Sequence, residues 1–210
     1  MRFVLLIPIL AAALQADPVT ALETTSPFGI TFVSFSYNVP NSPGPVTAQI
    51  QGNASCNNAP SCSDQPASAA IDLSMDLYTS GPIREGVAYL QLTLSQTNGS
   101  VSGAIGPYSL GGCASDLSCP LFGYFPFELG VPFTIDLSGL ARGFPPMGGG
   151  GFVASAELWL YELPTQAGDP AGAPVQINLV PEPGSAGLAF TGLSALVLFA
   201  VRRRRNLPSI

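Results

Sequence analysis

The chain contains no histidine and no lysine, and these absences exclude several classes of function. Between residues 17 and 179 its only basic residues are Arg84 and Arg142. Nothing in that part of the chain can neutralise a row of phosphates, so we expect no binding to nucleic acid. Without histidine there is no Ser-His-Asp triad, no Cys-His pair and no histidine-ligated metal. We therefore expect no enzyme of these types and no cofactor.

Charged residues are also sparse, at 10% of the chain, whereas the sequence has 23 glycines and 21 prolines. The apolar residues fall in short runs that are broken by these turn formers. This composition favours an all-β exported domain over a helical or disordered one. Once the two ends described below are set aside, residues 17–179 have the length of one domain with a core of its own.

Alternation of apolar and polar residues, the pattern of a half-buried strand, recurs along this domain. Asn98-Gly99 follows one such segment and is a strong hairpin signal. Gly143 to Gly151 is expected to be a flexible loop between strands, since no Lys-Ser/Thr pair follows it to make a phosphate site. The pattern predicts an antiparallel β-sandwich or jelly roll. The alternating segments are 33–39, 71–78, 90–95, 131–138 and 152–163.

The first 16 residues have the features of a secretory signal peptide. Arg2 supplies a positive charge, residues 3–10 are apolar, and the cleavage zone is either Ala11-Ala12-Ala13 or Leu14-Gln15-Ala16. The apolar run is too short to span about 30 Å of hydrocarbon, which argues against a permanent anchor. We expect cleavage after Ala16 and export through the secretion translocon.

The other end has three parts in a fixed order: Val180-Pro181-Glu182-Pro183, an apolar segment from Gly184 to Val201, and the cluster Arg202-Arg203-Arg204-Arg205. The prolines favour an extended tether. A helix over residues 184–201 would reach about 27 Å, and the arginines would hold its end on the cytoplasmic side of the membrane. Residues 206–210 would form a short cytoplasmic tail.

This order resembles the PEP-CTERM sorting signal of Gram-negative bacteria. The resemblance covers residues 180–205 and implies recognition by an exosortase, a membrane enzyme that cuts near the Pro-Glu-Pro motif. It also implies an inner-membrane intermediate with the domain on the periplasmic side and a final place at the cell surface or in an exopolysaccharide matrix. The segment 127–158 is loosely similar to the late strands of PEP-CTERM passenger domains, which again implies a β-sandwich. The alternative for the tail is a plain membrane anchor that is never cut.

The four cysteines form two pairs with the same spacing, Cys56 with Cys62 and Cys113 with Cys119. In an exported chain we expect disulfides, and local pairing is the simplest of the three possible pairings. Each short bridge would stabilise the fold by roughly 2 to 2.5 kcal/mol. A zinc site is disfavoured, because its ligand pairs usually lie two to four residues apart.

Two sets of side chains remain as candidates for binding or chemistry. Glu157, Trp159 and Tyr161 would share one face of a strand, and a Trp/Tyr pair beside a carboxylate suits sugar rings. The alternative is that a loop or the second sheet covers Trp159 and Tyr161. Asp72 and Asp76 would share a strand face at about 13 Å, too far apart for a glycosidase pair.

The sequence therefore predicts an exported, non-catalytic structural or adhesive protein of the cell surface or matrix. A carbohydrate-binding module is the main alternative, and a small carboxylate-dependent hydrolase is a weaker one.

Overall fold

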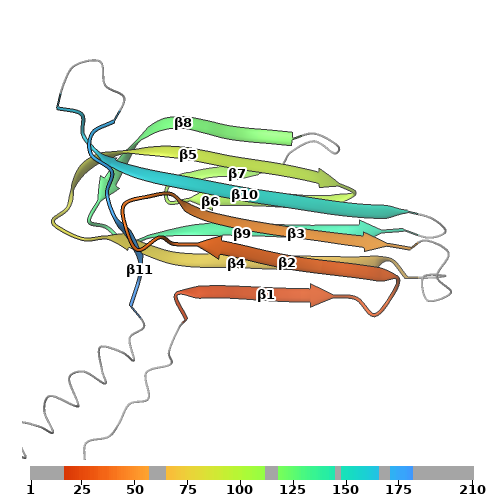
Figure 1. Cartoon of the computed structure of the whole chain (residues 1–210). Helices are drawn as coiled ribbons and strands as arrows, with labels where there is room; N and C mark the ends of the chain where they lie inside the picture. Colours follow the sequence, from red (N-terminus) through yellow and green to blue (C-terminus); the bar gives the residue numbers. More distant parts are fainter. Residues whose placement is uncertain (1–16, 57–64, 112–117, 145–147, 166–170, 182–210) are drawn as a thin grey trace, which may run out of the picture. The chain divides into compact units, whose positions relative to one another are not determined.

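The computed structural model describes residues 17–56, 65–111, 118–144, 148–165 and 171–181, and these form an all-β body (Figure 1). Residues Pro18–Val180 make one compact unit. Across the described ranges no helix is long and apolar enough to cross a membrane. The predicted signal peptide over residues 1–16 and the predicted helix over residues 184–201 lie outside the described residues.

The strands form two antiparallel sheets. The first sheet has the order β1 (Val19–Thr25), β4 (Ala67–Thr79), β9 (Phe133–Gly143), β6 (Gly99–Ile105) and β7 (Tyr108–Gly111), and β11 (Ile177–Leu179) also pairs with β4. The second sheet has the order β2 (Ile30–Asn38), β3 (Val46–Ser55), β10 (Gly149–Glu162), β5 (Arg84–Thr97) and β8 (Ser118–Leu129). The expectation of an all-β, antiparallel architecture is confirmed.

The core lies between the sheets and is built from alternate residues of the long strands. On β4 the side chains of Ile71, Leu73, Met75 and Leu77 are all buried, while Asp72 and Asp76 between them are exposed. The same alternation holds on β5, β9 and β10. Burying one face of each strand in this way fixes its register, because a slip by one residue would turn every apolar side chain outward.

The side chain of Phe152 on β10 packs against both sheets. It is 3% exposed, and its ring occupies the space above Gly52 of β3 and Gly139 of β9. A Cβ atom at Gly139 would lie 2.2 Å from two atoms of the ring, and one at Gly52 would lie 2.4 Å from it. Both positions therefore need glycine for close packing.

Three local predictions differ from the structure. Asn98 does turn the chain, with a φ of 47°, but β5 and β6 belong to different sheets, so this turn links the layers and is not a hairpin. Residues Gly149–Gly151 begin β10 and pair with β3, so they are not loop. The strand around Phe35 and Tyr37 forms as β2, yet these side chains stay 40% and 45% exposed because β2 is the edge of its sheet.

Candidate functional site: an aromatic sheet face

An aromatic cluster lies on the outer face of the second sheet, the side away from the core. The register places Trp159 of β10 beside Tyr89 of β5, and Tyr89 beside Tyr124 of β8. Tyr161 lies two residues along β10, and Phe122 lies two residues before Tyr124. We call these five residues the aromatic face.

Four rings of the aromatic face, all except Phe122, contact one another in a chain. Trp159 and Tyr161 are nearly parallel, with ring centroids 6.1 Å apart and an angle of 9°. Tyr161 lies 6.5 Å from Tyr124, which lies 5.2 Å from Tyr89. Phe122 and Tyr124 are the most open, at 67% and 49% exposure, while Tyr89, Trp159 and Tyr161 are half-buried.

Glu157 is positioned by Trp159. The indole Nε1 donates a hydrogen bond to Oε1 of Glu157 at 2.8 Å, so the carboxylate is fixed beside the ring. The sequence predicted that Glu157, Trp159 and Tyr161 share one face, and β10 has all three on its outer side. The core and the first sheet lie on the other side of β10, so the first sheet does not cover them.

A small polar hollow of about 180 Å³ adjoins the aromatic face. Its walls carry hydroxyl and amide groups and a single carboxylate. Gln91 lies opposite Glu157 across the β5–β10 pair, and Thr47 lies opposite it across the β3–β10 pair. We call these side chains the polar hollow: Ser36, Thr47, Gln49, Gln91, Ser155 and Glu157.

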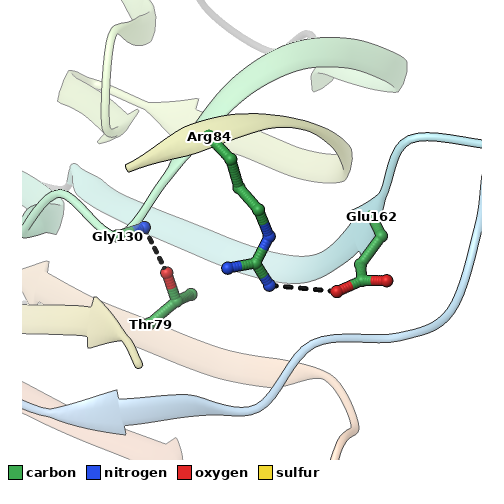
Figure 2. A network of polar contacts seen from close by, with 4 residues as sticks. All are labelled: Thr79, Arg84, Gly130 and Glu162. Carbon is green, nitrogen blue, oxygen red and sulfur yellow. Dashed lines mark hydrogen bonds and ion pairs between the residues drawn. The ribbon is translucent and has the colours of Figure 1, made fainter. Parts of the chain in front are cut away.

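The end of β10 beside Tyr161 is held by contacts on both sides. Beyond Leu158, which pairs with the first residue of β3, the chain at residues 173–175 takes the place of β3 beside β10. The amide of Glu162 donates to the carbonyl of Ala173, and that of Val175 donates to the carbonyl of Leu160. On the β5 side, Arg84 forms an ion pair with Glu162 at 3.0 Å (Figure 2).

The adjoining turns are also fixed. The buried hydroxyl of Thr79 accepts a hydrogen bond from the amide of Gly130 at 2.6 Å (Figure 2). This bond ties the last residue of β4 to the turn after β8. The aromatic face thus lies on a braced part of the sheet, as a preformed binding surface requires.

The surroundings of Tyr161 raise the pKa of its phenol. Burial raises the pKa of Tyr161, and Tyr124, Glu157 and Tyr89 raise it further. All of these effects disfavour the negatively charged phenolate. Tyr161 therefore stays neutral and able to donate a hydrogen bond at any pH below about 10.

The outer face of the first sheet carries a second polar group of residues. The segments Ile71-Asp72-Leu73-Ser74 and Ile135-Asp136-Leu137-Ser138 lie side by side on β4 and β9, with Leu73 paired to Leu137. Each aspartate consequently faces a serine of the other segment. Ser74 donates to Asp136, and Ser138 donates to Asp72.

This aspartate pair does not favour a hydrolase. Both carboxylates are exposed and accept hydroxyl hydrogen bonds, Asp72 from Ser138 and Asp136 from Ser74 and Thr134, so neither lies in an apolar environment. Carboxylate-dependent hydrolysis requires two different environments, one for the acid and one for the base or nucleophile. Among the described residues no group of three or more His, Cys, Asp or Glu is arranged to hold a metal.

The predicted disulfides are visible in part. Cys56 and Cys119 are both disulfide-bonded, and Cys56 is buried with its sulfur 3.3 Å from the amide of Ala67. Cys62 and Cys113 lie outside the described residues, so local pairing stays a prediction.

The predicted sorting motif begins where the last strand ends. The amide of Val180 donates to the carbonyl of Asp76 at 2.9 Å, and the amide of Asp76 donates to the carbonyl of Pro18 at 2.8 Å. Both ends of the compact unit therefore meet β4 at one residue. Pro181 is exposed, whereas Glu182, Pro183 and Arg202 to Arg205 lie outside the described residues.

Comparison with known proteins adds no assignment. No protein-family model matches the chain, and no curated protein matches it.

Proposed function

We propose that this is an exported, non-catalytic protein of the cell surface or extracellular matrix that binds polysaccharide through its aromatic face. The observation that supports binding is the chain of four contacting rings on the open side of the second sheet, with Glu157 fixed beside them. Aromatic rings bury the apolar faces of sugars, and nearby polar groups bind their hydroxyls.

The chemistry of this surface favours a neutral polysaccharide. The aromatic face and the polar hollow together contain one carboxylate and no cation. Amide and hydroxyl groups both donate and accept hydrogen bonds, which matches sugar hydroxyls. An acidic polymer would be repelled by Glu157 and by a chain of net charge −6.

The test of binding is affinity electrophoresis through gels that contain a neutral or an acidic polysaccharide. We expect the neutral polymer to retard the wild-type protein, and Trp159→Ala to weaken binding about tenfold or more. Leu22→Ala is the matched control, because Leu22 is 66% exposed on the first sheet and should not matter. Equal retardation of the Trp159→Ala and wild-type proteins would rule out this surface.

Export and sorting are proposed from the two ends of the sequence. The signal peptide over residues 1–16 delivers the domain across the membrane, and the PEP-CTERM-like signal over residues 180–205 holds it there for an exosortase. The exposure of Pro181, directly after a hydrogen-bonded Val180, is compatible with access by such an enzyme. Membrane lipid and this enzyme are the partners of the tail.

The test of sorting is to replace Pro181-Glu182-Pro183 by three alanines and to follow the protein in its native host. We expect the variant to stay uncut in the membrane fraction while the wild-type protein loses its tail. A change of Arg142→Ala, far from the tail in sequence, is the control. Unchanged processing of the triple variant would contradict the sorting proposal and would leave the binding proposal intact.

A further inference from the structure

Among the described residues, no strand pairs with the outer edge of β2 in the second sheet. An edge strand presents unpaired backbone groups that can pair with another chain, and proteins usually blunt such edges with charges, prolines, bulges or short strands. The nine residues Ile30–Asn38 contain no charged residue, no proline and no glycine. They combine high β-propensity with zero charge, which is the composition of a strand that pairs readily.

The other edges of the described sheets are blunted. Strand β8 carries Pro120 and Pro126, and its Gly123 has a φ of 142°. Strand β7 has only four residues, and β1 carries Glu23. Strand β11, which also lies at the edge beside β4, has only three residues. Among the edge strands of the described residues, β2 thus differs from the rest in having none of these devices.

The side of β2 that faces the core is also incompletely covered. Phe35 is paired with buried Ile50, and Tyr37 with buried Ala48, so both aromatic side chains point toward the space between the sheets. The facing edge strand β1 leaves them partly open. A further strand placed beside β2 would cover both rings as well as pair its backbone.

We propose that this further strand is β2 of a second copy, paired antiparallel about a two-fold axis. Two copies with a net charge of −6 each repel one another, whereas β2 brings no charge to the contact. A two-fold pairing satisfies both free edges in one closed interface. It joins the two second sheets into one, with both aromatic faces on the same side.

The test is a charge swap at Ser34, the central residue of β2. Two full-length copies with different tags are expressed together, solubilised in detergent and recovered through one tag. We expect wild-type copies to be recovered together, and recovery to fall severalfold when both carry Ser34→Lys or both carry Ser34→Glu, because like charges then lie opposite each other. One Lys copy with one Glu copy should restore it.

The controls separate strand pairing from misfolding and from contact through the tail. The same Lys and Glu changes at Thr24, on the edge strand β1, should leave recovery unchanged, and every variant has the same tail. Fluorescence of Trp159 reports on folding. The proposal is overturned if wild-type copies do not associate, if the Lys–Lys pair associates as well as wild type, or if the Lys–Glu pair fails to recover. Failure of the polysaccharide-binding test would neither support nor contradict the pairing of β2 strands.

Discussion

The close packing of Phe152 predicts a large cost for adding one methyl group at Gly139. A Cβ there would lie 2.2 Å from the ring, so the ring or strand β9 must move by more than about 1 Å to reach ordinary contact. The ring is also confined by Gly52, where a Cβ would lie 2.4 Å away. Overpacking of this kind costs about 1–3 kcal/mol, and the lower entropy of the unfolded alanine chain offsets about 0.4–1 kcal/mol of it.

The assay is urea unfolding followed by the fluorescence of Trp159, the one tryptophan of the chain. We expect Gly139→Ala to be less stable than wild type by about 1–2 kcal/mol, and Gly139→Ala with Phe152→Leu to lose less than the sum of the single changes. Gly111→Ala is the matched control, because its Cβ would lie 3.6 Å from Ser102, an ordinary contact. If Gly139→Ala unfolds at the same urea concentration as Gly111→Ala, the account of packing between the sheets is wrong.

Three further predictions follow from particular contacts. Absorbance titration of the tyrosines should lose an alkaline step in Tyr161→Phe, because burial raises the folded pKa of Tyr161. The contribution of Tyr161 to stability is complete below about pH 10 and is lost as the pH rises through that raised pKa. Ile177→Ala should destabilise the protein by about 2–4 kcal/mol in urea unfolding, since Ile177 is 1% exposed and anchors β11. An unchanged stability would mean that β11 does not pack against the core. Peptide mapping before and after reduction should find Cys56 linked to Cys62 and Cys113 linked to Cys119. A disulfide that joins a cysteine of the first pair to a cysteine of the second would refute local pairing.

Alternation in the sequence predicted the strands β4, β5, β9 and β10 and their buried faces, whereas β1, β3 and β7 were not predicted. The apolar residues Ile71, Leu73, Met75 and Leu77 recur with a period of two, and burial of one face alone produces that pattern. The shared face of Glu157, Trp159 and Tyr161 follows from the same rule. These features depend only on residues within one strand.

Features that depend on which strands pair were not predictable in this way. Tyr124 and Phe122 join the aromatic face because β8 pairs with β5, a contact between distant parts of the chain. The turn at Asn98 has the same local chemistry whether it closes a hairpin or links two sheets, so the hairpin prediction was wrong. The repeat of Ile-Asp-Leu-Ser was visible in the sequence, but its meaning as a pair of adjacent strands required the register.

The most direct test of the central claim is a fluorescence titration of the wild-type protein with a soluble neutral polysaccharide. Trp159 lies within the proposed site and is the single tryptophan, so its emission reports on that surface alone. We predict a saturable change in emission that Tyr124→Ala weakens and that an acidic polysaccharide does not produce. An emission that stays constant up to high concentrations of every neutral polymer tried would contradict binding at the aromatic face.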